Sequence, residues 1–440
     1  MQADPAFKQR IKLEQNGYRS MSELTSAPTP SDTAALPLAG LRVVDASAVV
    51  MGPYASQWLA DLGAEVIKIE PPQGDSTRNT GPTTEKGMSP IFLGVNRNKK
   101  SVVIDLKHAD GQAALLQLIG TADVFMHSMR PQKLGALGLD PDAVRSANPR
   151  LVYATLHGFA ESGPYGGRPA YDDIIQGMAG SVDMMVQQSG EARFLPTIAA
   201  DKTTGLVAAM AIMAALMQRH STGQGSYVEV PMFETMAAFN LVEHCYGQHF
   251  EPPQSVAGYP RVLADSRRPY RTADGYVCMM PYTDAHWQRF FAAMGVPEFA
   301  RDVRFCSIAA RTENIVALYE TMGQFGAGKT TDEWLALCDA LEIPAGRVNR
   351  LDDLKRDAHL QATGFFTRVN DPAMGELCFP GVPVLFNGHR PPVATPPRLG
   401  ADTQAVLLQA GLSAQQVANL VASGAVVLNP SSRPSNPSEI

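Results

Sequence analysis

Between residues 38 and 230, short apolar runs alternate with longer segments of helical spacing. Helical spacing follows the first run at residues 52–62, and residues 111–119 separate two later runs. Strands that alternate with helices predict a parallel sheet covered by helices, which is an α/β fold. Sites in such sheets lie beyond the carboxyl ends of the strands. The runs typical of strands are Arg42–Ser47, Glu65–Glu70, Ser101–Leu106, Asp123–His127, Leu151–Leu156 and Ser226–Val230.

A long apolar segment, residues 203–220, is rich in Ala, Met and Leu, and it is apolar on nearly all sides. A helix of this kind is normally buried. No apolar run approaches the roughly 20 residues that a membrane span requires. We therefore predict a core helix and no membrane association.

The pattern changes after about residue 240. Residues 270–280 resemble a hairpin with its turn at Asp274-Gly275, and three helical segments follow at 286–294, 315–325 and 331–341. This part predicts a second, smaller α+β domain. Later strands are expected at residues 346–351 and 381–387, with a last helix at 402–412.

Composition excludes several classes of protein. Hydrophobic residues make up 45% and charged residues 18% of the 440 residues, which is too apolar for a disordered chain. The net charge of -6 and the lack of a basic run exclude a nucleic-acid-binding surface. The five widely spaced cysteines are typical of reduced thiols, and no signal peptide is evident. These features predict a cytoplasmic location.

Common cofactor motifs are absent from the sequence. Gly52-Pro53 follows the first strand without the G-x-G-x-x-G spacing of a dinucleotide loop, and no Walker-type lysine motif is present. The nine histidines form no close Cys/His/carboxylate cluster in sequence, so we predict no metal site. An NAD-linked oxidoreductase is therefore only weakly supported.

Asp201 stands at the start of the predicted core helix. One interpretation is a helix N-cap, a position that aspartate favours. The other is a carboxylate that the helix dipole keeps ionised and that acts as a nucleophile. The two interpretations are compatible. Tyr171-Asp172 suits a turn, and the segment 96–101 suits either a solvated basic turn or a phosphate site.

In this order and spacing, the segments together resemble the class III coenzyme A transferases, also called the CaiB/BaiF family. The resemblance runs from Leu38 to about Gly225 and continues more weakly to about Leu420. It is carried by Leu38–Asp45, Gly52–Ala55, Leu59–Pro72, Gly74-Asp75, Asn96–Ser101, Asp105–Lys107, Asn148–Tyr153, Gly158-Phe159, Ser162–Tyr165, Tyr171-Asp172, Gln176-Gly177, Asp201 and Thr222–Gly225.

The resemblance implies a Rossmann-like large domain with a smaller α+β domain, in an interlocked, ring-like homodimer. It implies that the carboxylate of Asp201 attacks an acyl-CoA donor to form a mixed anhydride, and that a carboxylic acid acceptor then receives CoA through an aspartyl-CoA thioester. Coenzyme A is thus a substrate, and no cofactor is bound permanently. The expected parts are a flexible arm (1–37), the large domain (38–240), the small domain (241–355), a C-terminal return to the large domain (356–428) and a tail (429–440).

The resemblance also predicts contacts with CoA, with cations among them placed for its phosphates. Relatives often carry other residues at Ala48 and Val50, so details of these contacts are expected to differ. The predicted contact residues are Asn96, Arg97, Lys99, Lys100, Ile104, Asp105, Leu106, Lys107, Ser128, Met129, Arg130, Tyr171 and Asp172.

Alternatives remain within and outside the family. Racemases and epimerases of this family pair the aspartate with a histidine, but Tyr171 stands at that position, and a tyrosine with a pKa of about 10 is a poor base near neutral pH. An isomerase that moves CoA between two carboxylates of one molecule also fits. Outside the family, the alternatives are an NAD-linked oxidoreductase and a non-catalytic CoA-binding protein.

The segment 258–268 replaces a glycine-rich lid that many relatives carry. We hypothesise that Arg261, Arg267 or Arg268 receives the distal carboxylate of a dicarboxylic acyl group. Exposed loop arginines without a ligand are the alternative, because arginine is mostly found at protein surfaces.

Overall fold

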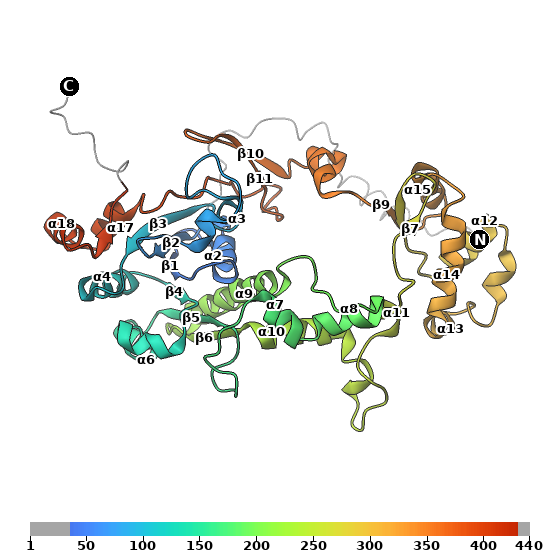
Figure 1. Ribbon diagram of the computed structural model, residues 1–440, viewed down its shortest axis with the longest axis horizontal. Coiled ribbons are helices and arrows are strands. Elements are labelled where there is room, and N and C mark those ends of the chain that lie inside the picture. The colour runs from blue at the N-terminus through green and yellow to red at the C-terminus, as the bar shows by residue number, and fades with distance from the viewer. Residues whose placement is uncertain (1–35, 430–440) are drawn as a thin grey trace, which may run out of the picture. The chain divides into compact units, whose positions relative to one another are not determined.

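A computed structural model describes residues 36–429 of the chain. Nearly all of the predicted arm and tail therefore lies outside the described residues. The described part contains a seven-stranded sheet in the order β12-β3-β2-β1-β4-β5-β6 (Figure 1). The strands are β1 (Arg42–Ala46), β2 (Glu65–Glu70), β3 (Lys99–Ile104), β4 (Val124–His127), β5 (Val152–His157), β6 (Tyr227–Pro231) and β12 (Val426–Val427).

The first six strands pair in parallel, which confirms the predicted parallel sheet, and β12 joins β3 antiparallel at one edge. Successive side chains of a strand point to opposite faces of the sheet, so each strand contributes to two cores. Val43 and Ala154 belong to one apolar cluster, whereas their neighbours Val44 and Tyr153 belong to the other.

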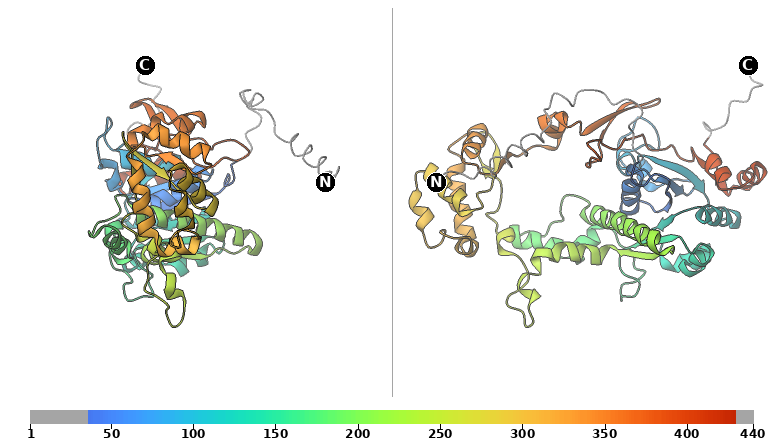
Figure 2. Two further views of the ribbon diagram at one scale, coloured as in Figure 1. Left: turned by 90° about the vertical axis from the view of Figure 1, so that its right-hand side faces the viewer. Right: turned by 180° about the vertical axis from the view of Figure 1, so that it is seen from behind.

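Different helices cover the two faces of the sheet, and the two views in Figures 1 and 2 agree on this arrangement. The cluster on one face includes side chains from α2 (Met51–Asp61), α9 (Ala199–Thr222) and α10 (Met232–His244). The cluster on the other includes side chains from α4 (Ala109–Gly120), α6 (Pro141–Ala147), α17 (Thr403–Gln409) and α18 (Ala414–Ala422).

The helix α9 is the predicted core helix. It has the length and composition of a membrane span, with a mean hydropathy of 1.3 in its best window, so the expectation that no segment approaches a span is corrected. Nine of its residues are nevertheless buried, and its apolar side packs against the sheet in the cluster that also contains α2 and α10. Burial on the sheet is what a core helix requires.

A separate apolar cluster lies in the second half of the chain. Its strands are β7 (Tyr270–Arg271), β8 (Tyr276–Met279) and β9 (Ala345–Arg347), and the predicted turn at Asp274-Gly275 joins the first two. The helices α12 (Asp284–Ala293), α14 (Ile315–Gly326) and α15 (Thr331–Ala340) cover this sheet with aromatic residues, including the fully buried Trp334.

Two sequence predictions in the C-terminal part were wrong. Residues 381–387 form no strand; a hairpin of β10 (Phe366–Asp371) and β11 (Gly375–Pro380) precedes them. Asp371 accepts hydrogen bonds from the N–H groups of Ala373 and Met374 and so closes the hairpin turn. The predicted strand 346–351 shrinks to β9, and α18 was missed although Ser413 and Gln416 form a capping box at its start.

The remaining helices are short. They are α3 (Pro90–Val95), α5 (Pro131–Leu134), α7 (Asp172–Met178), α8 (Ser181–Ser189), α11 (Pro260–Leu263), α13 (Ile308–Glu313) and α16 (Ala358–Ala362), with 3-10 turns at 76–79, 135–137, 246–249, 297–301 and 351–356.

The C-terminal segment contacts the large sheet at several points. β12 pairs with β3, and the carboxylate of Asp402 accepts a hydrogen bond of 2.9 Å from the N–H of Ser101. The Arg97 guanidinium donates to the carbonyl oxygen of Pro380. The domain boundaries given above stay a prediction.

Candidate active site

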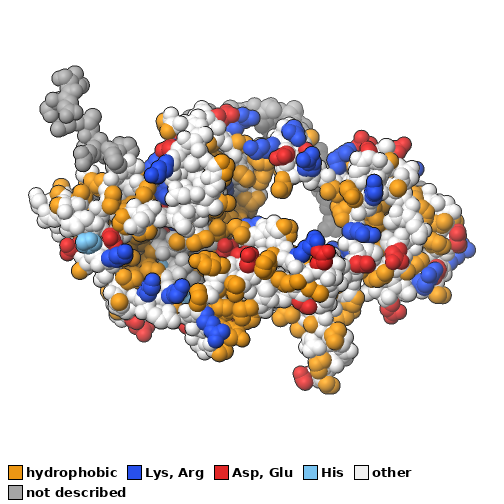
Figure 3. Space-filling view, viewed as in Figure 1, with side chains coloured by type: hydrophobic (Ala, Val, Ile, Leu, Met, Phe, Trp, Pro, Cys, Tyr) orange, Lys and Arg blue, Asp and Glu red, His pale blue; other side chains and the backbone are white. Residues whose placement is uncertain are grey.

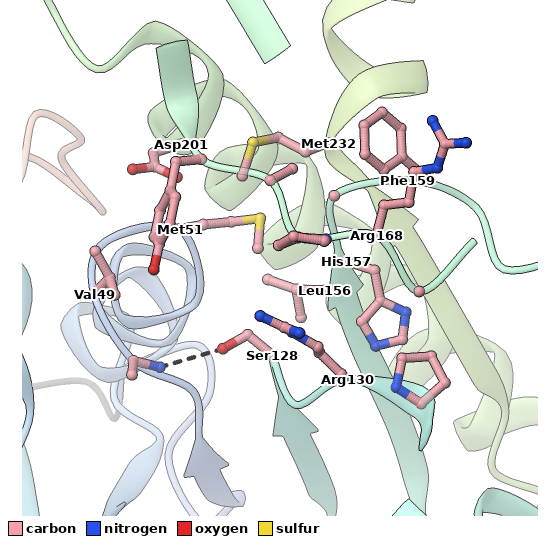
Figure 4. A pocket seen from close by; sticks show the side chains of 17 residues that line it. Val49, Met51, Ser128, Arg130, Leu156, His157, Phe159, Arg168, Asp201 and Met232 are labelled. Carbon is pink, nitrogen blue, oxygen red and sulfur yellow. Dashed lines mark hydrogen bonds between the residues drawn. The ribbon is translucent and has the colours of Figure 1, made fainter. Parts of the chain in front are cut away.

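The strand order places a crevice between β1 and β4. Apart from β12, the order is 3-2-1-4-5-6, the order of doubly wound dinucleotide-binding sheets, in which ligands bind where the connections diverge at the carboxyl ends. The loops after these two strands meet here, because the N–H of Ala48 donates to the Ser128 hydroxyl at 3.4 Å. A pocket of about 280 Å³ opens at this point (Figure 4).

The loop after β1 is held in a strained conformation. Val49 has a φ of 70°, which a β-branched residue rarely adopts. Its N–H lies 3.2 Å from a carboxylate oxygen of Asp75. Lys68 binds the same carboxylate at 2.8 Å and donates to the carbonyl oxygen of Ser47, and both charged side chains are buried. The ion pair therefore fixes one wall of the pocket.

The loop after β4 is fixed by His127, which is fully buried. Its Nδ1 accepts a hydrogen bond from the N–H of Met129, so Nε2 carries the proton and donates to the Tyr153 hydroxyl at 3.0 Å. Burial, and then the nearby His157, lower the pKa of His127 to about 3. A neutral imidazole thus holds the segment that carries Ser128 and Arg130.

Asp201 lies in the first turn of α9, two residues after its start, and its side chain lines the pocket. The residue at the N-cap position is Ile198, so the N-cap interpretation was wrong. Burial, followed by the negative charge of Asp172, raises the pKa of Asp201 to about 6. These two effects outweigh the expected stabilisation of the charge by the helix dipole.

Asp172 holds the backbone of Asp201 in place. The carboxylate of Asp172 accepts a hydrogen bond of 3.0 Å from the backbone N–H of Asp201 and one of 2.6 Å from the Gln176 amide. Asp172 is buried and does not line the pocket, whereas Tyr171 beside it does and is 70% exposed. A Cβ at Gly158 would lie 2.4 Å from Cβ of Ala170, so the glycine lets the loop that carries Tyr171 approach the end of β5.

Two predicted phosphate ligands lie in the interior. Arg97 is 7% exposed and pairs with Asp61 at 2.7 Å. Lys99 is 6% exposed and donates to the carbonyl oxygen of Pro53 at 2.8 Å, and burial lowers its pKa to about 7. Neither side chain is free for a phosphate in this structure, because each satisfies buried acceptors.

Two further predicted residues stand next to these. Asn96 is buried and accepts a hydrogen bond from Lys99 at 2.9 Å, and the half-exposed Lys100 pairs with Glu65 at 2.5 Å. None of the segment 96–100 lines the pocket.

The other predicted contacts divide between the pocket and its surroundings. Ser128, Arg130, Tyr171 and Asp201 line the pocket together. Met129 lies behind it, where its carbonyl oxygen is 3.1 Å from Nε2 of His157. The segment Ile104–Lys107 does not line the pocket: Ile104 is buried in β3, the Asp105 carboxylate accepts from the N–H of Lys107, and Leu106 packs at the edge of the second apolar cluster.

Several lining residues were not predicted as site residues. Arg168 adds a second cation, which stacks over the Tyr165 ring at 4.7 Å, and within residues 36–429 neither Arg168 nor Arg130 forms an ion pair. Ser162–Tyr165 entered the sequence analysis only as part of the family motif, and Arg168 was not predicted to line the pocket. Apolar walls come from Met51, Leu156, Phe159 and Met232, and His157 lies on the same side of the pocket in Figure 4 as Arg130.

The three arginines of the segment 258–268 lie around Tyr319. Arg261 donates to the Tyr319 hydroxyl at 3.2 Å and stacks over Tyr282. Arg267 and Arg268 are exposed and line a hollow of about 470 Å³ that Tyr319 also lines. Whether they bind a carboxylate stays a prediction.

Comparison with known proteins identifies the family. Residues 38–403 match CoA-transferase family III. The chain is 33% identical over 395 residues to the probable fatty acyl-CoA transferase Rv3272 of Mycobacterium tuberculosis. The alignment covers 86% of this chain and 99% of that protein. It is 31% identical to the succinyl-CoA:glutarate CoA-transferase of Mus musculus, over 87% of this chain and 88% of the mouse protein.

Solved structures agree with the sequence comparisons. The crystal structure of Rv3272 superposes with a TM-score of 0.73 at 31% identity, over 84% of this chain and 98% of that one. A CAIB/BAIF family protein from Brucella suis gives a TM-score of 0.72 at 28% identity, over 86% of this chain and all of that one. The suspected resemblance is confirmed: this chain belongs to CoA-transferase family III.

Proposed function

We propose that this CoA-transferase moves CoA from an acyl-CoA donor to a carboxylic acid, with Asp201 as the nucleophile. One observation carries the proposal: within residues 36–429, Asp201 is the only acidic side chain that lines the pocket, and the other lining side chains are apolar, neutral polar or cationic. A carboxylate with a pKa of about 6 is mostly ionised at neutral pH, and its partial desolvation makes it a stronger nucleophile.

The proposed reaction exchanges acyl groups in four steps. The Asp201 carboxylate attacks the thioester carbonyl, which forms a mixed anhydride and releases CoA thiolate. The thiolate attacks the aspartyl carbonyl, which gives an aspartyl-CoA thioester and frees the donor acid. The acceptor carboxylate then displaces the thiolate to form a second anhydride, and the thiolate finally attacks the acceptor acyl carbon and regenerates Asp201. Each step breaks one acyl bond and forms another. Covalent catalysis thus divides one difficult transfer into several easier steps.

The position of Arg130 and Arg168 supports a role in binding CoA. Both residues line the pocket and are free of ion pairs within the described residues, and guanidinium forms strong charge-assisted hydrogen bonds with phosphate. We assign the phosphates of CoA to these two residues in place of Arg97 and Lys99.

A racemase of the same family would need an acid/base pair across the substrate. Tyr171 is the residue at the position of the racemase histidine, and it is 70% exposed. His157 lines the pocket, but its Nε2 lies at hydrogen-bonding distance from the Met129 carbonyl oxygen. We therefore expect no exchange of the α-hydrogen of an acyl-CoA when the protein is incubated in D₂O, and rapid exchange would favour a racemase.

Trapping the acyl-enzyme tests the nucleophile. Hydroxylamine added during turnover should convert the side chain of Asp201 to a hydroxamate, which peptide mass spectrometry identifies. Asp201→Asn should lower the rate of exchange by about four orders of magnitude or more, as the loss of other catalytic nucleophiles does, while CoA still binds. A hydroxamate elsewhere, or an active Asp201→Asn protein, contradicts the proposal.

The substrates named for the mouse relative suggest a dicarboxylic acid as one partner in the exchange. We propose that Arg267 and Arg268 receive its distal carboxylate. Replacing both with alanine should raise KM for a dicarboxylate without changing KM for a monocarboxylate. Arg304→Ala, which removes an exposed arginine paired with Asp302 in the same domain, serves as the control. Equal effects on both substrates would exclude this role.

A further surface supports the proposed homodimer. Figure 3 shows apolar side chains exposed over the part of the view where Figure 1 labels α7, α9 and α10. On two of these helices, Met217 of α9 is 76% exposed, and Val242 and Phe239 of α10 are 75% and 58% exposed. Exposed apolar patches on helices mark protein interfaces, and we propose that a second copy of this chain covers this one in a cytoplasmic dimer.

A further inference from the structure

A second polar cluster lies beside the pocket, where β5 ends next to the edge strand β6. His157 is the last residue of β5, and Glu229 on β6 lies opposite Thr155, two residues before it. Residues two apart on a strand share a face, so His157 and Glu229 point to the same side of the sheet. Glu161 follows in the next loop. One nitrogen of His157 and one oxygen of each carboxylate lie within 4.8 Å of one another.

The hydrogen bonding of His157 leaves one nitrogen facing a carboxylate. Nε2 lies 3.1 Å from the carbonyl oxygen of Met129, which only accepts hydrogen bonds, so Nε2 carries a proton. Nδ1 lies 2.9 Å from a carboxylate oxygen of Glu161 but makes no hydrogen bond, and the residue is 8% exposed. In the neutral ring, a lone pair of the buried His157 therefore faces a lone pair of the partly exposed Glu161, and a positive charge between them would remove the repulsion.

The second carboxylate favours a divalent ion over a proton as that charge. An oxygen of Glu229 accepts a hydrogen bond of 2.7 Å from the N–H of Glu161, which keeps Glu229 close to the other two groups. A single proton on Nδ1 would leave one of the two negative charges uncompensated, whereas a divalent ion neutralises both. An imidazole nitrogen with two carboxylate oxygens is a ligand set that suits zinc and neighbouring transition metals, with water completing the coordination.

We propose that His157, Glu161 and Glu229 bind a divalent transition-metal ion beside the CoA pocket. The ion would join the loop after β5 to the edge strand β6. The same loop supplies Phe159 and Ala170 to the pocket wall, so the ion would stabilise the shape of the pocket and take no part in the transfer chemistry. This site was not predicted from the sequence, because His157 and Glu229 are 72 residues apart and become neighbours only through strand pairing.

Metal uptake by the full chain tests the site. After dialysis against a chelator, Zn²⁺ or Co²⁺ is added, and bound metal is measured by calorimetry and elemental mass spectrometry. We expect one ion per chain, with a visible absorption band for Co²⁺. Glu229→Gln keeps an oxygen for the Glu161 N–H but removes the charge, and it should weaken binding by at least about tenfold, as the loss of weaker outer-shell contacts already does.

Variants of the other two ligands and a control variant show whether metal uptake depends on these three residues. Glu161→Gln and His157→Asn should weaken binding in the same way as Glu229→Gln. Glu243→Gln is the control, because Glu243 pairs with His244 at 3.5 Å but has no third ligand nearby in the described residues, and it should leave uptake unchanged.

Thermal unfolding provides a readout that is independent of activity. An ion that binds only the folded chain raises Tm, and Zn²⁺ should raise Tm of the wild-type protein but not of Glu229→Gln. No stoichiometric uptake by the wild-type chain, or uptake that survives both Glu161→Gln and Glu229→Gln, would overturn the proposal. Either result would leave the transferase chemistry of Asp201 untouched, because hydroxylamine trapping tests that separately.

Discussion

The chemistry of Asp201 depends on a raised pKa. Because the pKa is about 6 and attack requires the ionised form, we predict that kcat/KM falls as the pH drops below about 6. Asp172→Asn removes the negative charge that contributes to this shift, so the acid limb of the profile should move to lower pH. Burial, the larger cause, remains, and the limb should therefore stay above the ordinary aspartate pKa of 3.8. An unchanged limb in Asp172→Asn would contradict this account.

Arginines in the pocket and in the interior should respond differently to substitution. Arg130→Ala or Arg168→Ala should raise KM for acyl-CoA about tenfold or more, since a hydrogen bond to a charged group contributes about 1.5–3 kcal/mol. Arg97→Ala should instead lower the free energy of unfolding by about 3–5 kcal/mol, because it leaves the buried carboxylate of Asp61 without a partner. Steady-state kinetics and denaturant titration of the three variants distinguish the two roles, and a tenfold KM effect in a stable Arg97→Ala protein would reverse the assignment.

At the scale of elements, the contact between α2 and α9 positions the site. Gly205 lies one turn after Asp201, and a Cβ there would come within 2.8 Å of the carbonyl oxygen of Met51. Gly205→Ala should push the two helices apart, lower the free energy of unfolding by about 1–3 kcal/mol and reduce kcat by displacing Asp201. Gly323→Ala, in α14 with no atom within 4 Å of its Cβ, is the control and should be neutral or slightly stabilising. Equal stability of the two variants would exclude the close contact.

At the scale of the whole molecule, the exposed apolar side chains of α9 and α10 predict self-association. Met217→Glu combined with Val242→Glu should shift a dimer toward a monomer, because burying two added carboxylates without partners is costly. Light scattering coupled to size-exclusion chromatography measures this shift. The control, Val303→Glu, alters a side chain outside α9 and α10 that is 83% exposed, and it should leave the oligomeric state unchanged. A wild-type monomer at high concentration would contradict the proposed dimer.

Local patterns in the sequence were sufficient to predict most strands of the large sheet. Alternating apolar runs located all six parallel strands to within two residues, because strand and helix periodicities are properties of neighbouring residues. The hairpin of β10 and β11 was missed, since its strands are only partly buried and their pattern is weak. The family motif identified Asp201 as the candidate nucleophile, and that role remains a prediction.

The sequence by itself determined the positions of the six parallel strands, the family and the candidate nucleophile. Only the tertiary structure decided which cations face the pocket: Arg130 and Arg168 line it, whereas Arg97 and Lys99 are buried in the interior. It also raised the pKa of Asp201 and brought His157 next to Glu229. Burial, charge interactions and ligand geometry depend on distances between residues far apart in the chain, and these distances are fixed only when the sheet and its helices assemble.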